Sequence, residues 1–145
     1  MNLFYQVALG TVLLGASCIL HILALFACLP LLKSTAQHSW ITKKKFKEIL
    51  LVGMMIAAIL ASHGFQIWLW AAVWLALGAF VEMQEALYFS AVTYTTLGYG
   101  DIVLGPSIRL FSTFSAVSGL LSFGVSIALL VGLVSRLLPD DITGD

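Results

Sequence analysis

Three long apolar runs, separated by shorter and more polar segments, constrain the fold of this chain most strongly. They extend from about Leu3 to Leu32, from Glu48 to Ala79 and from Ser107 to Leu138. Each run exceeds the roughly 20 residues that a helix needs to cross a bilayer core. With 61% hydrophobic and only 10% charged residues, the chain is too apolar for a soluble domain of its length. We therefore predict an all-α membrane protein with three transmembrane helices.

The positions of the basic residues predict how these helices are oriented. The seven Lys and Arg residues are concentrated between the first two runs, and only Arg109 and Arg136 lie elsewhere. The positive-inside rule places this basic segment, residues 33–47, in the cytoplasm, so the N-terminus faces outward and the C-terminus is cytoplasmic. Tryptophans near the far end of the second run fit an outer membrane interface; they are Trp68, Trp70 and Trp74.

A shorter segment between the second and third runs has a different character. Residues Gln84 to Thr95 are amphipathic and too short to span, and they lead into TTLGYGD at 95–101 and a turn at Gly105-Pro106. This pattern predicts a re-entrant pore helix followed by a loop. Irregular backbone at membrane depth is tolerated only where protein buries it or where it lines a watery pathway. The segment therefore indicates a pore.

The glycines of this loop suggest which ion passes. Gly98 and Gly100 occupy alternating positions, which suits a backbone whose successive carbonyls face one axis and replace the water shell of K+. We expect ion coordination by the carbonyls of residues 96–99 and by the Thr96 hydroxyl, with the side chains of Leu97 and Tyr99 pointing away from the axis. A ring of such loops needs four chains, which predicts a homotetramer. The predicted potassium selectivity filter is Thr96, Leu97, Gly98, Tyr99 and Gly100.

Two stretches of the sequence resemble the potassium-channel superfamily. Ala86-Leu87-Tyr88-Phe89 through Asp101 resembles its pore-helix and filter signature, and GLLSFG at Gly119 to Gly124 resembles its inner helix. The resemblance covers roughly Gln84 to Arg136, with the second apolar run aligned more loosely as an outer helix. It implies passive potassium conduction, with K+ as the permeant ion, no organic cofactor, no small-molecule substrate, no nucleic-acid partner and no enzymatic activity.

The resemblance also implies roles for individual residues. Tyr88 and Phe89 match the aromatic residues that brace the filter tyrosine, and Asp101 matches the acidic residue just outside the filter. The negative end of the pore-helix dipole, near Thr95, would favour a cation. Gly119 takes the place of the gating hinge. The cavity residues implied are Leu120, Phe123 and Ile127.

Two departures from the family pattern accompany this resemblance. Leu97 stands where valine or isoleucine is commoner, and Val92 stands where some bacterial members have a glutamate paired with the aspartate. The predicted domains are an extra N-terminal transmembrane helix at 1–32, the basic cytoplasmic loop at 33–47, a pore domain at 48–138 and a short cytoplasmic tail at 139–145. A compact chain of this plan suits a bacterial inner membrane, with the filter facing outside.

Other functions and gating modes stay open from the sequence. The alternatives to a potassium channel are a nonselective cation channel, a non-conducting regulatory subunit, and a single-chain transporter. Such transporters carry four dissimilar loops with usually one glycine each, whereas this chain has one loop with two. Gating could use a pivot at Gly119, a gate in the filter, or none, as in a constant leak.

Several polar residues within or beside the apolar runs have two readings. His63, Gln66, Trp70 and Trp74 share one face of the second helix, and His63 either senses pH or, as we prefer, bonds neutrally to Gln66, Ser62 or a neighbouring helix. A serine stripe on the third helix either permits close packing, which we prefer, or hydrates the pore. It consists of Ser112, Ser115, Ser118, Ser122 and Ser126.

Charged residues and cysteines at other positions carry weaker expectations. The cluster Lys43 to Lys45 could attract anionic membrane lipid. Glu82 and Glu85 could raise the cation concentration at the outer mouth, or be solvated loop charges. Arg109 could pair with an acidic neighbour or meet lipid headgroups. Cys18 and Cys28 lie in the first apolar run and are expected to be apolar fillers rather than a disulfide.

Overall fold

The computed structural model describes residues 2–37 and 44–137, and within these ranges it contains four helices and no strands. They are α1 (Leu3–Gln37), α2 (Lys44–Ala76), α3 (Met83–Tyr94) and α4 (Arg109–Leu137). Three of them, α1, α2 and α4, are long and apolar enough to cross a membrane. The predicted all-helical fold with three long apolar helices is therefore confirmed.

The long helices extend beyond the apolar runs on one side. Helix α1 continues through Pro30 to Gln37, and α2 already begins at Lys44, so both ends of the predicted loop 33–47 are helical. Only residues 38–43, which include Lys43 and His38, lie outside the described chain there. Proline removes one backbone donor, but long apolar helices tolerate it. The Lys, Ala and Gln residues that follow favour a helix.

Helix α2 ends in a hydrogen-bonded glycine cap. The Ala79 amide donates to the Trp74 carbonyl at 2.9 Å, and the Gly78 amide donates to the Leu75 carbonyl at 3.0 Å. This pair of hydrogen bonds is a Schellman motif, which requires a residue in the left-handed conformation. Gly78 provides it with a φ of +66°. The predicted second helix reached Ala79; the cap ends it at Ala76.

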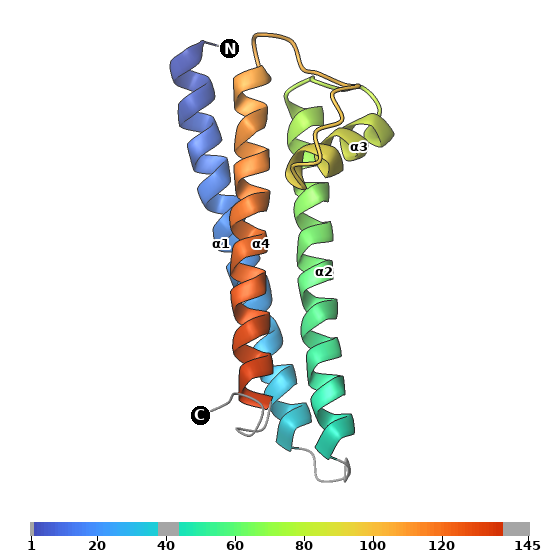
Figure 1. Cartoon of the computed structure of the whole chain (residues 1–145). Coiled ribbons are helices and arrows are strands. Elements are labelled where there is room, and N and C mark those ends of the chain that lie inside the picture. The colour runs from blue at the N-terminus through green and yellow to red at the C-terminus, as the bar shows by residue number, and fades with distance from the viewer. Residues whose placement is uncertain (1, 38–43, 138–145) are drawn as a thin grey trace.

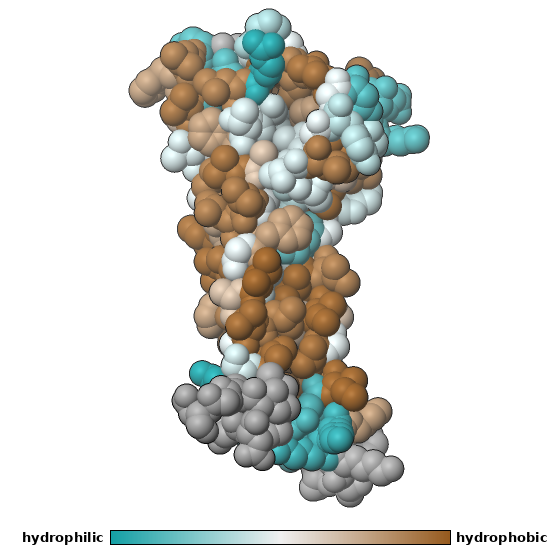
Figure 2. Space-filling model, in the orientation of Figure 1, coloured by the Kyte–Doolittle hydropathy of each residue, from teal (hydrophilic) through white to brown (hydrophobic). Residues whose placement is uncertain are grey.

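The arrangement of the helices brings the two ends of α3 to different depths. Helices α1, α2 and α4 run along the long axis of the molecule, and α3 folds back beside the end of α2 (Figure 1). The segment after α3 then returns to the end where α4 begins (Figure 1). Helix α1 packs against both α2 and α4, and α3 packs against the same two helices. On the face drawn in Figure 2, apolar residues cover the middle and polar residues gather toward the ends.

An aromatic core joins α2, α3 and α4 at the α3 end of the molecule. The Trp74 ring lies 5.5 Å from the Phe89 ring and 5.4 Å from the Phe111 ring, measured between centroids. Trp70 and Trp74 are buried, whereas Trp68 is 56% exposed. The prediction placed the three tryptophans near a membrane interface; of these, Trp68 has an exposed side chain, whereas Trp70 and Trp74 face the aromatic core. Hydropathy locates a helix end but not the face that meets a neighbour.

Candidate functional site at the end of α3

The segment after α3 is tied to the last turn of that helix. The Thr95 amide donates to the Ala91 carbonyl at 3.1 Å, and the Thr95 hydroxyl donates to the same carbonyl at 2.7 Å. The Gly98 amide donates to the Val92 carbonyl at 3.2 Å. Free carbonyls at a helix C-terminus normally need such partners. The loop is therefore folded back onto the carbonyl end of α3, where the helix dipole is negative.

The backbone of the loop adopts left-handed angles at every second residue. Thr96, Gly98 and Gly100 have φ values of +60°, +57° and +79°. Glycine reaches this region without steric cost. A β-branched threonine does not, and left-handed backbone costs an L-residue about 1–2 kcal/mol. Strain of this kind at Thr96 marks the segment as a candidate functional site.

The loop is exposed in the single chain. Residues 95–100 are all exposed, with Leu97 at 55% and Tyr99 at 67% of their full accessible surface. The expected packing of these two side chains behind the loop is thus not provided by one chain. The single chain therefore leaves both large side chains open at its surface.

Asp101, the residue that follows the loop glycines, is bonded back to α3. The Tyr88 hydroxyl donates to Asp101 Oδ2 at 2.5 Å. This hydrogen bond lowers the pKa of the Asp101 carboxyl and raises the pKa of the Tyr88 hydroxyl. Phe89, the other aromatic residue singled out, lies in the aromatic core, 5.3 Å from the Phe80 ring between centroids.

A cavity of about 190 Å³ lies between the loop, α3 and the start of α4. Both Asp101 and Arg109 line it. In the part of the chain that the structure describes, the carboxylates lie beyond ion-pair distance from Arg109, and the ion pair found is Lys44 with Glu48 at 3.9 Å. Of the two readings of Arg109, pairing with an acidic neighbour is therefore not seen among the described residues.

Gly119 is the point where α4 touches the end of α3. It is buried, and a Cβ atom at this position would lie 1.8 Å from the Tyr94 carbonyl oxygen. No side chain fits there. The structure thus gives Gly119 a packing role between the two helices, whether or not α4 also pivots at this residue.

The three predicted cavity residues do not share one environment. Leu120 is 63% exposed and Ile127 is 61% exposed. Phe123 is half-buried, and its ring stacks on His63 with 4.1 Å between centroids. Leu120 and Ile127 thus lie open at the surface of the single chain, while Phe123 packs against His63 of α2.

Most of the serine stripe is buried against neighbouring helices. Ser115, Ser118, Ser122 and Ser126 are at most 2% exposed, whereas Ser112 is only partly buried. The Trp70 indole donates to the Ser118 hydroxyl at 3.0 Å. This burial supports the preferred reading of the stripe, which is close helix packing.

Polar residues of α1 form contacts that sequence reasoning missed. The Ser17 hydroxyl donates to Gln66 Oε1 at 2.6 Å, and Gln66 Nε2 donates to the Ser17 carbonyl at 2.7 Å. His63 bonds not to Gln66 or Ser62 but to Tyr94 and Ser126, so of the partners expected for it, residues of neighbouring helices are the ones observed. The available signal was the presence of polar residues in an otherwise apolar α1, because such groups seek partners in a membrane.

Neither cysteine forms a disulfide, and no group of three His, Cys, Asp or Glu side chains that could hold a metal ion is found within residues 2–37 and 44–137. The oxygen atoms near the loop include its backbone carbonyls, the hydroxyls of Thr95 and Thr96, and the Asp101 carboxylate.

Comparison with known families identifies the class of protein. The sequence model of a family described as "ion channel" matches residues 49–136, which is more than half of the chain. The chain therefore belongs to this ion channel family. The matched region includes nearly all of α2 and contains α3, the loop and nearly all of α4, but not α1. No curated protein and no solved structure matched the chain.

Proposed function

We propose that this ion channel conducts potassium selectively through the loop 96–100. The observation that carries the proposal is the left-handed backbone at Thr96, Gly98 and Gly100 in a TTLGYGD segment fastened to the carbonyl end of α3. A potassium filter replaces the ion's hydration shell with closely spaced backbone carbonyls. Alternating left-handed residues bring successive carbonyls toward one side of a strand.

In this proposal the ion is bound by oxygen atoms of the backbone and of one side chain. The carbonyls of residues 96–99 form the stacked sites, and the Thr96 hydroxyl provides the innermost ligand. The C-terminal end of α3, which carries about half a negative charge, points at the inner side of these sites and favours a cation. Asp101 holds the outer side in register through its bond to Tyr88.

The conducting unit is proposed to be a homotetramer. A single loop supplies only one side of an ion's coordination shell, so four are needed around the axis. The exposure of residues 95–100, and of Leu97 and Tyr99 in particular, fits a loop whose packing is completed by neighbouring copies. Leu120 and Ile127 of α4, both exposed, would then line the pathway on the inner side.

The proposed orientation places the loop on the outer side of the membrane. The basic residues Lys33, Lys44, Lys45, Lys47 and Arg136 all lie toward the ends of α1, α2 and α4 that are opposite to α3 (Figure 1). That end is proposed to be cytoplasmic. Helix α3 then enters the membrane from outside and the loop returns to the outside, as a re-entrant segment does.

Ion uptake into liposomes tests this proposal. Purified protein is reconstituted into vesicles loaded with potassium, and uptake of labelled rubidium is compared with uptake of labelled sodium and with uptake in the presence of barium. We expect rubidium uptake that barium blocks and sodium uptake at least about tenfold lower. Equal uptake of sodium would contradict selectivity and leave a nonselective channel, and no uptake of either ion would favour a non-conducting subunit or a closed gate.

A pair of glycine substitutions ties the flux to the loop. Gly98→Ala forces a side chain onto a left-handed residue although space is available, because the nearest atom to its Cβ lies 3.9 Å away. We expect it to abolish selective rubidium uptake. Gly105→Ala is the matched control, since it has open space and no left-handed φ, and it should leave uptake unchanged.

A further inference from the structure

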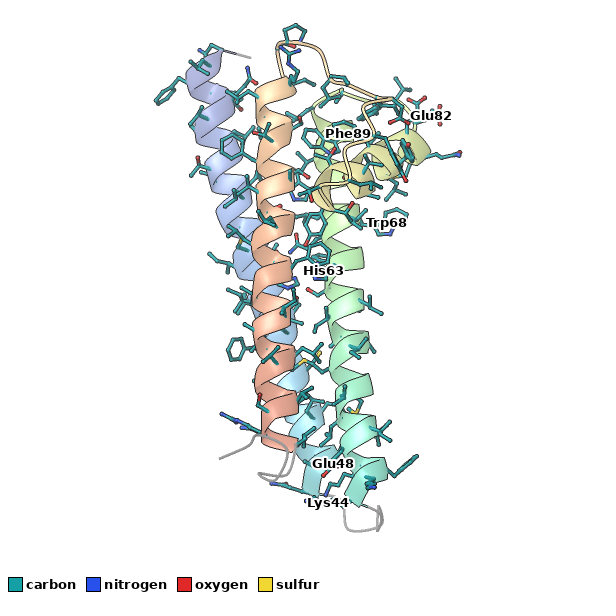
Figure 3. All side chains as sticks on the ribbon, viewed as in Figure 1. Lys44, Glu48, His63, Trp68, Glu82 and Phe89 are labelled. Atoms are coloured by element: carbon teal, nitrogen blue, oxygen red, sulfur yellow. The ribbon has the colours of Figure 1, made fainter. Side chains whose placement is uncertain are left out.

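A cluster of buried polar side chains lies where all four helices come together, just beyond the end of α3. His21 of α1, His63 of α2, Tyr94 of α3 and Ser126 of α4 are each at most 7% exposed. Figure 3 shows His63 pointing from α2 toward α4, below the end of α3. Polar side chains buried this deeply among apolar helices destabilise the fold unless they form hydrogen bonds with one another.

These side chains form one continuous line of hydrogen bonds. His21 Nδ1 lies 2.8 Å from the Ser62 hydroxyl, and His21 Nε2 lies 2.9 Å from the Ser126 hydroxyl. The same Ser126 oxygen lies 3.2 Å from His63 Nε2, and His63 Nδ1 lies 3.0 Å from the Tyr94 hydroxyl. We call this the His21–Tyr94 line; it consists of Ser62, His21, Ser126, His63 and Tyr94.

Counting donors and acceptors shows that the line is complete without any charge. A neutral imidazole has one donor and one acceptor nitrogen, and a hydroxyl can donate once while accepting. The protons can therefore all point from Ser62 toward Tyr94, or all point the opposite way. Every link is satisfied in either case. The two imidazoles also pack together, with 4.7 Å between ring centroids.

The line ends at Tyr94, the residue of α3 from which the chain continues into the proposed filter. Tyr94 is the last residue of α3, and the strained Thr96 follows two positions later. The Tyr94 carbonyl oxygen abuts Gly119, so its backbone is held by α4 while its hydroxyl is held by His63. The end of α3 is thereby fixed on two sides. A site that must discriminate between ions by geometry needs such support.

Helix α1 takes part in this support although it lies outside the region that matches the ion channel family. Residues 49–136 contain three members of the line from α2 and α4 together with Tyr94, but His21 comes from α1. His21 is linked by hydrogen bonds to Tyr94 through Ser126 and His63, and its ring also packs on that of His63.

We propose that α1 contributes to ion selectivity. In this proposal His21 and His63 are positioning residues: they hold the end of α3 in place and thereby set the selectivity of the filter. This inference rests on the proposed function, since the property that it assigns to the histidines is potassium selectivity. The competing interpretation is that the line only strengthens the helix packing, in which case losing a link lowers stability and leaves selectivity unchanged.

Conservative substitutions can test the hydrogen bonds of the two ring nitrogens of each histidine one at a time. An asparagine amide reaches about as far as Nδ1, and a glutamine amide reaches about as far as Nε2. His63→Asn therefore preserves the link to Tyr94, whereas His63→Gln preserves only the link to Ser126. In the same way His21→Gln preserves the link to Ser126, whereas His21→Asn preserves only the link to Ser62. Tyr94→Phe removes the last hydroxyl and nothing else.

The readout is the ratio of rubidium to sodium uptake by liposomes that contain equal amounts of assembled protein. We expect His63→Gln, His21→Asn and Tyr94→Phe to lower this ratio by about three- to tenfold, as expected for losing one hydrogen bond in a membrane. His21→Gln keeps the whole path from Ser126 to Tyr94 and should stay within about twofold of the unmodified protein. His63→Asn keeps Tyr94 bonded but cuts the path to His21, so it should lower the ratio only as far as His21→Asn does. The control Ser115→Ala removes a buried hydroxyl of α4 that has no partner among the described residues, and it should leave the ratio unchanged.

Each outcome decides between the interpretations. A selective unmodified protein whose ratio is unaffected by Tyr94→Phe and His21→Asn would overturn this inference and leave the proposed function standing. An unmodified protein without preference for rubidium would overturn both. If a histidine variant fails to assemble, Tyr94→Phe decides alone. Failure of that variant to assemble would make the line purely structural and overturn the inference.

Discussion

The centre of the helix bundle and the loop 95–101 are both polar segments in an otherwise apolar molecule, but they are completed in different ways. In the centre, Ser17, His21, His63 and Gln66 find hydrogen-bond partners on other helices of the same chain. In the loop, residues 95–100 are exposed, and Thr96 keeps a strained left-handed backbone. The polar groups of the centre are therefore bonded within one chain, whereas the loop is left exposed by it.

This difference indicates which residues serve stability and which serve function. Substitutions in the bundle centre that do not reach Tyr94 should lower the stability of the assembled protein and leave ion preference unchanged. Substitutions in the loop should do the opposite. Residues where the two regions touch should affect both properties, and they offer the strongest tests.

The largest effect is expected at Gly119, where the two regions meet. Gly119→Ala would place a Cβ 1.8 Å from the Tyr94 carbonyl oxygen, and a backbone atom cannot move aside alone. Overpacking typically costs about 1–3 kcal/mol and occasionally more, so we expect at least the upper end of that range. The fraction of assembled protein that survives heating, measured by size-exclusion chromatography, checks this.

The control for Gly119 is Gly124→Ala on the same helix, which meets open space and should leave stability unchanged. If Gly119→Ala assembled as stably as the control and changed only the open probability, the residue would be a pivot and not a packing contact. That result would contradict the close approach of α4 to α3 described above.

A smaller loss is expected from Gly10→Ala, within the bundle. Its Cβ would lie 2.4 Å from the Phe114 ring, but a half-buried ring can shift where a backbone carbonyl cannot. We expect a cost of about 1–3 kcal/mol in the same heating assay, with the ratio of rubidium to sodium uptake unchanged. Gly15→Ala, which meets open space, is the control. A changed uptake ratio would show that the bundle and the loop are not separable here.

Gln66→Met should cost less again. It removes both hydrogen bonds to Ser17 while keeping a similar volume. Hydrogen bonds between membrane helices average about 0.6 kcal/mol and reach about 1.7 kcal/mol, so the loss should fall in that range. The exposed Gln84→Met is the control. Stability equal to that of the control would mean that α1 is held by apolar packing alone.

The smallest effect is expected from Tyr88→Phe, which acts on the loop alone. It removes the hydrogen bond to Asp101 at the exposed outer end. We expect the uptake ratio to fall by about twofold, with thermal stability unchanged. Lower stability with an unchanged ratio would reverse the assignment of this pair.

The same pair predicts how selectivity depends on pH. The bond to Tyr88 lowers the pKa of Asp101 below its usual 3.8, so the carboxylate stays ionised and bonded at neutral pH. A lowered pKa means that this contribution is lost only when the pH falls below that usual value. The uptake ratio of the unmodified protein should therefore be constant from pH 8 to about pH 5. A decline within that interval would require a different titrating group.

Much of the fold was predictable from the sequence, because length and apolarity decide whether a helix can span a membrane. The three long helices and the short α3 appear close to where the apolar and amphipathic runs place them. The end of α2 was predicted three residues too late, at Ala79, although Gly78 is the residue type that a helix cap needs. The helical course through Pro30 was not, because a proline inside an apolar helix is compatible with either a kink or an end.

The contacts between helices could not be predicted from the sequence. The shared face of His63 and Gln66 was visible from their spacing, yet their partners depend on how α1 lies against α2 and α4. Tyr94 was not recognised as a support because its hydroxyl meets His63 only after α3 folds back. Gly119 likewise matched a hinge by resemblance, whereas its contact with the Tyr94 carbonyl is visible only in three dimensions.

The central claim is that the loop 96–100 selects potassium, and the reversal potential tests it most directly. Purified protein is placed in a planar bilayer with potassium on one side and an equal concentration of sodium on the other. A tenfold preference for a monovalent ion corresponds to about 59 mV, so we predict a reversal potential displaced by more than about 60 mV in the direction that favours potassium. A reversal potential near zero, with current flowing, would contradict the account.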